Sequence, residues 1–127
     1  MDRKFLITGA VFGLLAVILG AFAAHGLKNS LSPAALGSFE TGVRFQMYHA
    51  FLLLILGNIR MEKRNKTIYI LIGLGTILFS GSIYLLTLAP LLGLDLTSIA
   101  LVTPLGGTLL IVGWILLVLN FTKLKMK

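Results

Sequence analysis

Long runs without a charged residue constrain this chain more than any other feature of its sequence. The first run extends from Phe5 to Ala24 and contains no Asp, Glu, Lys or Arg. A hydrocarbon core about 30 Å thick takes about 20 helical residues at a rise of 1.5 Å each, so this run is long enough to cross a bilayer as a helix. Only 12% of the 127 residues are charged, and the mean hydropathy is +1.01, which is too apolar for a water-soluble domain of this size. We therefore predict an all-α integral membrane protein.

Four such segments indicate a single four-helix transmembrane domain over residues 1–127. The predicted helices cover about 5–27, 40–60, 67–89 and 104–121. The second is expected to extend toward Ser32-Pro33, which reads as an N-cap followed by proline at the first helical position. Pro90 ends the third helix, and Thr103 is expected to cap the fourth. The mainly apolar connector at 91–102 either lies in the membrane interface or dips into the bilayer.

Nine of the eleven basic residues lie on one side of the predicted bundle. The helix 3–4 connector has no base, and the side to which it belongs receives only Lys28 and Arg44. The positive-inside rule therefore places both termini in the cytoplasm. Because the bases flank apolar segments and form no patch on an amphipathic surface, we do not expect nucleic acid as a partner. The nine bases on the cytoplasmic side are Arg3, Lys4, Arg60, Lys63, Arg64, Lys66, Lys123, Lys125 and Lys127.

The N-terminal segment has a competing interpretation. Arg3-Lys4, an apolar stretch and Ala21-Phe22-Ala23 together imitate a secretory signal peptide with its cleavage site. The apolar run is longer than the central region of a usual signal peptide. We therefore expect it to be retained as the first helix.

Small residues mark faces on which helices can approach closely. Gly9, Gly13, Ala16 and Gly20 recur at spacings of three and four, so they share a narrow face of the first helix. Within a bilayer, small residues supply much of the attraction between helices because they allow backbone contact. We expect this face to pack within the chain, with a subunit interface as the alternative. The packing candidates in the other helices are Gly73, Gly106 and Gly113.

Polar side chains from different helices are expected at similar depths. Counting 1.5 Å per residue from Arg60 puts His49 near the bilayer centre and Gln46 in the outer half. Glu40 and Arg44 are four residues apart, a spacing that favours an ion pair. The predicted polar cluster consists of His25, Glu40, Arg44, Gln46, Tyr48, His49, Ser80, Ser82, Tyr84 and Thr103.

This cluster has two interpretations. Gln46 and His49 are expected to join helices through hydrogen bonds of about 0.6 kcal/mol each. The alternative makes His49 a proton or ligand site, because ionisable residues inside membranes often line pathways. Trp114 falls inside the fourth helix instead of at an interface, so we expect it to be a packing residue.

No motif for an enzyme, a cofactor or a metal accompanies the cluster. His25 and His49 lie on different helices, and neither a His-x-x-x-His pair nor a carboxylate cluster occurs. The absence of cysteine excludes disulfides, thiol catalysis and thiolate metal sites. We therefore expect a non-enzymatic structural, lipid-binding or partner-binding role. The expected partners are membrane lipids and either a second copy of the chain or another membrane protein.

The alternative function is a small transporter or channel. It would need several copies of the chain, because four helices with so few polar residues can hardly enclose a water-filled path alone.

Four segments of the sequence resemble the signature segments of the YgdD/YwdK-like family, small multi-pass membrane proteins of unknown function. They are GAFAAHGL from Gly20, FETGVRFQMYHA from Phe39, FSGSIYLL from Phe79 and TPLGGTLLIVGW from Thr103, one for each predicted helix. The resemblance implies a four-helix protein of a bacterial inner membrane and brings no known reaction. The chain departs from the family pattern at Ala23, where the family usually has glycine, and at Phe45, where it usually has tyrosine.

Overall fold

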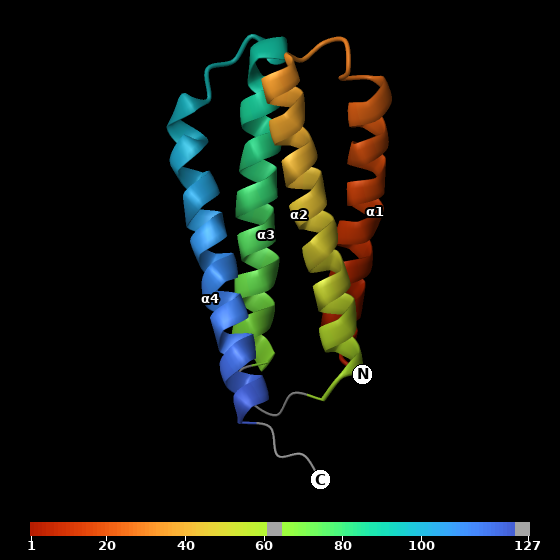
Figure 1. Cartoon of the computed structure of the whole chain (residues 1–127), viewed down its shortest axis with the longest axis vertical. Coiled ribbons are helices and arrows are strands. Elements are labelled where there is room, and N and C mark those ends of the chain that lie inside the picture. Colours follow the sequence, from red (N-terminus) through yellow and green to blue (C-terminus); the bar gives the residue numbers. More distant parts are fainter. Residues whose placement is uncertain (61–64, 124–127) are drawn as a thin grey trace.

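The computed structural model describes residues 1–60 and 65–123, and within them all regular structure is helical. Figure 1 shows four long helices side by side, and consecutive ones run in opposite directions. The prediction of an all-α four-helix architecture is confirmed. One end of the bundle holds the start of α1 and the end of α4, and we call it the terminal end. We call the opposite end the connector end. The helices are α1 (Arg3–His25), α2 (Pro33–Asn58), α3 (Asn65–Leu88) and α4 (Val102–Thr122).

Local side chains explain where the first two helices begin. The Asp2 carboxylate accepts a hydrogen bond from the Lys4 backbone N–H at 3.3 Å and caps α1. The Ser32 hydroxyl accepts from the Ala35 backbone N–H at 3.1 Å, and proline occupies the first position of α2. As a result α2 is one uninterrupted helix that begins seven residues before the predicted start at 40.

The predicted cap of the fourth helix is wrong. Thr103 lies inside the first turn of α4, and Leu101 precedes the helix without a capping side-chain bond. The chain instead enters α4 directly from a 3₁₀ turn, η2 (Thr97–Leu101), whose last residue adjoins the helix. Because the backbone is already helical in this 3₁₀ turn, no separate capping residue starts α4.

Two 3₁₀ turns form the connection between α3 and α4. The first, η1 (Ala89–Leu92), is followed by Gly93 at φ +69°, a left-handed conformation that favours glycine. Before η2, the carboxylate of Asp95 accepts hydrogen bonds from the backbone N–H and the hydroxyl of Thr97, at 3.2 and 2.9 Å. These bonds hold the pKa of Asp95 below its ordinary value, the backbone bond more strongly.

The two middle helices form the centre of the bundle. α1 packs along α2, α2 packs along α3, and α4 packs along α3. α2 and α3 have eight buried residues each, whereas α1 has five and α4 has four. The outer helices therefore expose most of their apolar side chains, with Leu14, Val17 and Ile111 all more than 60% exposed. A surface of this kind suits contact with lipid.

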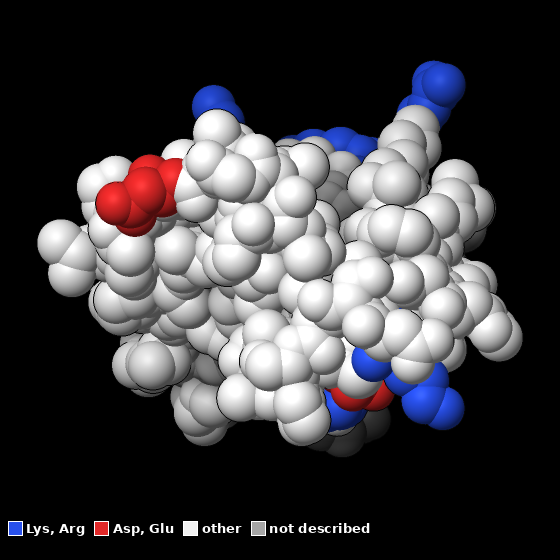
Figure 2. Space-filling view, turned by 90° about the horizontal axis from the view of Figure 1, so that it is seen from above, with Lys and Arg blue, Asp and Glu red and all other residues white. Residues whose placement is uncertain are grey.

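Three segments of the described chain are long and apolar enough to cross a membrane: Arg3–His25, Asn65–Leu92 and Thr97–Thr122. α2 is not among them although it has 26 residues, because its polar residues lower its hydropathy. Its length of about 39 Å nevertheless matches that of its neighbours. Seen from the connector end, charged side chains are few and lie near the edges of a mostly uncharged surface (Figure 2).

Three helix ends meet at the terminal end of the bundle. The Asp2 backbone N–H donates to the Gly57 carbonyl at 2.8 Å, and the Asp2 carboxylate accepts from the Asn65 side-chain amide at 3.2 Å. These bonds fasten the start of α1 to the end of α2 and the start of α3. Four of the bases used to predict the orientation, Lys63, Arg64, Lys125 and Lys127, lie outside the described residues.

Candidate functional site

Gln46 joins three helices inside the bundle. Its side chain is only 6% exposed. The Gln46 amide nitrogen donates to the Phe12 carbonyl of α1 at 2.8 Å, and its amide oxygen accepts from the Tyr84 hydroxyl of α3 at 2.7 Å. Both ends of the side-chain amide are thus paired, as a polar group buried in a membrane protein requires.

Gly42 brings α2 and α3 close enough for this arrangement. A Cβ atom at Gly42 would lie 2.9 Å from the Tyr84 ring, so only glycine leaves the ring its place. The Gly42 carbonyl also accepts a hydrogen bond from the Ser80 hydroxyl at 2.7 Å. Ser80 is 1% exposed, and its bond forms a second polar link between the two helices.

His49 forms a separate link between α2 and α4. Its Nδ1 lies 2.7 Å from the Phe45 carbonyl, and the Trp114 indole N–H donates to its Nε2 at 3.1 Å. A carbonyl only accepts, so Nδ1 carries the hydrogen and the lone pair of Nε2 receives the indole. His49 is therefore held as the neutral tautomer with both nitrogens occupied. Trp114, expected only to pack, also donates this hydrogen bond.

Ser82 and Thr103 connect α3 to α4 near the connector end. Their hydroxyls are hydrogen-bonded to each other, and the Ser82 hydroxyl also donates to the Phe79 carbonyl at 3.0 Å. Because that bond uses the only hydrogen of Ser82, Thr103 donates to Ser82.

The other four members of the predicted cluster lie on the surface. His25, Glu40, Arg44 and Tyr48 are exposed. Arg44 donates to the Thr41 hydroxyl at 3.0 Å, and the expected ion pair with Glu40 does not form between these two described residues. The cluster thus divides into interior links and a surface group. In the part of the chain that the structure describes, every buried side-chain nitrogen or oxygen has a hydrogen-bond partner.

The small residues of α1 face α2. A Cβ atom at Gly9 would lie 2.9 Å from the Ala50 carbonyl oxygen, and one at Gly20 would lie 3.5 Å from the Val43 side chain. Gly13 comes next to Ala50 as well, and Ala16 is 1% exposed. The α1 face thus contacts another helix of the same chain along its whole length.

The α3–α4 contact depends on Gly75, which was not among the predicted packing residues. A Cβ at Gly106 would come within 2.9 Å of the Gly75 carbonyl oxygen, and one at Gly75 within 3.1 Å of the Gly106 carbonyl oxygen. At Gly113, a Cβ would lie 2.7 Å from the Ile72 side chain. Nothing lies within 4 Å of a Cβ at Gly73, the α3 residue proposed for packing. Gly73 and Gly75 are two residues apart and so lie on different faces of α3, but a spacing pattern alone could not show which face meets α4.

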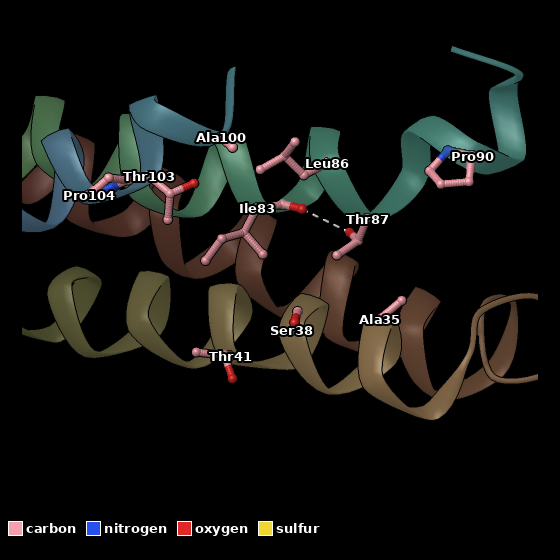
Figure 3. Close-up of a pocket in the computed structure, with 10 residues that line it drawn as sticks. All are labelled: Ala35, Ser38, Thr41, Ile83, Leu86, Thr87, Pro90, Ala100, Thr103 and Pro104. Atoms are coloured by element: carbon pink, nitrogen blue, oxygen red, sulfur yellow. Dashed lines mark hydrogen bonds between the residues drawn. The ribbon is translucent and has the colours of Figure 1, made fainter. Parts of the chain in front are cut away.

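A groove of about 590 Å³ lies between α2 and α4 in the connector half of the bundle. Figure 3 shows the α3 residues Ile83, Leu86 and Thr87 between the groove residues of α2 and those of α4. Most of the lining is carbon. The groove's hydroxyl side chains are Ser38, Thr41, Thr87 and Thr103. Of these only Thr103 belongs to the predicted cluster, since hydroxyls at helix surfaces carry no distinctive sequence signal.

These features define a class: a multi-pass membrane protein built as a four-helix bundle, with a small, internally paired polar interior. Residues 19–107 match the family described as "Protein of unknown function (DUF423)". The chain belongs to this family.

Its relatives are named as membrane proteins. A UPF0382 membrane protein of Staphylococcus saprophyticus is 39% identical over 124 residues, 96% of this chain and 99% of the relative. The UPF0382 inner membrane protein YgdD of Escherichia coli strain K12 is 36% identical over 130 residues, which cover 99% of this chain and 95% of the relative. No solved structure matches the chain. The resemblance to the YgdD-like family and the predicted location in the bacterial inner membrane are confirmed.

Proposed function

We propose that this protein has a non-enzymatic role in the membrane and binds the acyl chain of a membrane lipid in the groove between α2 and α4. The observation that carries the proposal is the groove itself. Its volume of about 590 Å³ falls within the 300–1,000 Å³ range of small-molecule sites.

The three threonines of the groove leave its surface suited to hydrocarbon. The Thr87 hydroxyl donates to carbonyls of its own helix, at 2.9 Å from Ile83 and 3.1 Å from Tyr84. The Thr41 hydroxyl donates to the Gly37 carbonyl at 3.0 Å, and Thr103 is paired with Ser82. Because these hydrogens are already used, the side chains present mainly their methyl groups to an occupant.

A small oligomeric transporter has less support. The interior polar side chains are paired with one another or with backbone carbonyls, so they offer few free groups to a passing ion or proton. His49, the residue on which that alternative rests, has both ring nitrogens occupied.

The proposal is tested by filling the groove. Ala100 lines it, and Ala100→Phe would place a ring where the acyl chain is expected. Native mass spectrometry of protein purified from bacterial membranes in mild detergent would report retained lipid. We expect one lipid on the unchanged protein and none on the Ala100→Phe variant.

The matched control is Ala10→Phe, which enlarges an alanine in the separate groove between α1 and α2. This variant should keep the lipid. An unchanged protein without lipid, or an Ala100→Phe variant that retains as much as the control, would contradict the proposal.

A further inference from the structure

The outward face of α2 carries charges in the middle of a helix that lies among membrane-spanning segments. We call it the α2 outer face: Gly37, Glu40, Arg44, Tyr48, Phe51 and Ile55, all exposed. Spacings of three and four place these residues on one side of the helix. Arg44 lies eleven residues after the start of α2 and fourteen before its end, about 16 and 21 Å along the axis.

The two charges on this face lack a charged partner in the described chain. Arg44 donates to the Thr41 hydroxyl, and no described base forms an ion pair with Glu40. Charged side chains at membrane depth usually face the bundle interior or pair with one another. Here both side chains are exposed, although α2 packs along both α1 and α3.

The neighbouring side chains of the same face are large and apolar. Tyr48, Phe51 and Ile55 are 54%, 56% and 58% exposed. At the other end of the face, a Cβ at Gly37 would meet nothing within 4 Å, so the backbone there is open to close approach. Such a combination of open glycine, charge and aromatic residues is suited to contact with another helix.

We infer that a second copy of this chain packs its α2 outer face against the first, with Glu40 of each copy paired with Arg44 of the other. Two parallel α2 helices related by a two-fold axis along the membrane normal bring the same face together from both sides. Each copy supplies one Glu40 and one Arg44, so two ion pairs related by the two-fold axis form between the copies. The inference goes beyond the proposed function, because it concerns the face of α2 beside the groove and not the groove itself.

Charge favours a second copy over an anionic lipid as the occupant. A lipid phosphate that approached Arg44 would also meet the Glu40 carboxylate one helical turn away. A face with one charge of each sign is complementary to itself, and each charge is neutralised by its opposite.

Cysteine cross-linking tests the interface directly, because the chain contains no cysteine of its own. Single variants Tyr48→Cys and Ile55→Cys, oxidised in bacterial membranes, should form disulfide-linked dimers. The matched controls are Val17→Cys on α1 and Val118→Cys on α4, at positions 62% and 59% exposed. They should remain monomeric. Cross-linking at the control positions alone, or at none of the four, would overturn the inference.

Charge reversal tests the ion pairs within the Tyr48→Cys background. Glu40→Arg and Arg44→Glu should each abolish the cross-linked dimer, because like charges then face each other. The double variant with both changes should recover it. The milder Glu40→Gln and Arg44→Gln variants, which place no like charges together, should reduce the dimer and serve if a reversal prevents insertion.

Two results would overturn the reciprocal pairing: single reversals that cross-link as well as the parent, or a double reversal that stays monomeric while its Trp114 emission matches that of the parent. A dimer-free protein whose Arg44 variants lose bound lipid would assign the face to lipid instead.

Discussion

At the scale of single residues, Gln46 joins three helices inside the bundle, because its one side chain bonds to both α1 and α3. Replacing Gln46 with leucine would remove both bonds and leave the Tyr84 hydroxyl without its acceptor. We expect Gln46→Leu to lower the free energy of unfolding by about 1–2 kcal/mol, since interhelical bonds in membranes average about 0.6 kcal/mol and an orphaned hydroxyl adds to that loss. Titration with a denaturing detergent, followed through the single tryptophan Trp114, measures the change.

Tyr84→Phe is the control for this prediction, because it removes the hydroxyl and keeps the ring that packs against Phe39. It should lower the stability by about 0.6 kcal/mol. The two changes share one hydrogen bond, so the double variant should lose less than the sum of the single losses. Full additivity would show that the bond between them contributes nothing.

At the scale of helices, the α3–α4 contact depends on which glycines face the neighbouring backbone. Gly106→Ala would push a methyl group against the Phe79 backbone and the Gly75 carbonyl, and we expect it to destabilise the protein by about 1–3 kcal/mol. Gly73→Ala adds the same methyl group where the structure has space. It should leave the stability unchanged or raise it by up to about 1 kcal/mol, because alanine favours helix. Thermal unfolding of both variants in one detergent compares them, and equal losses would contradict the role of Gly106 in the α3–α4 contact.

The helices could be predicted from the sequence because their signals are local. Uncharged runs gave the four elements, and Ser32-Pro33 correctly indicated that α2 extends beyond its apolar core. Contacts between helices could not be predicted, since they depend on rotation and relative height. The acceptors of Gln46 and Ser80 are the backbone carbonyls of Phe12 and Gly42, and a carbonyl has no sequence signature.

The freedom of long side chains explains why the predicted ion pair between the described residues Glu40 and Arg44 does not form. The four-residue spacing did put Glu40 and Arg44 on one face, but the Arg44 guanidinium bonds to Thr41 instead. A Lys or Arg side chain has many rotamers, so a favourable spacing does not fix its partner.

At the scale of the whole molecule, the orientation in the membrane is open to direct measurement. The positive-inside rule predicts a cytoplasmic terminal end and an external connector end. Ser98→Cys lies in the external connector on this prediction, and Lys123→Cys follows α4. A membrane-impermeant thiol reagent applied to spheroplasts should label the first variant at once and the second only after the membrane is permeabilised.

The unchanged chain, which has no cysteine, gives the background for this labelling. Immediate labelling of Lys123→Cys, with a protected Ser98→Cys, would reverse the orientation and place the lipid groove in the inner leaflet.

The packing of α1 along α2 and of α4 along α3 bears on how the chain enters the membrane during synthesis. Each pair is a helical hairpin whose tight contact, at Gly9 in one and at Gly106 in the other, lies within the pair. α2 is too polar to count as a span alone, but on insertion beside α1 its Gln46 already finds the Phe12 carbonyl. Tyr84 and Ser80 arrive with the second hairpin and complete the remaining bonds. While the ribosome is still making the second hairpin, the first can form only the bond of Gln46 to Phe12, and the α2 groups that bond to Tyr84, Ser80 and Trp114 gain these partners when the second hairpin packs against it.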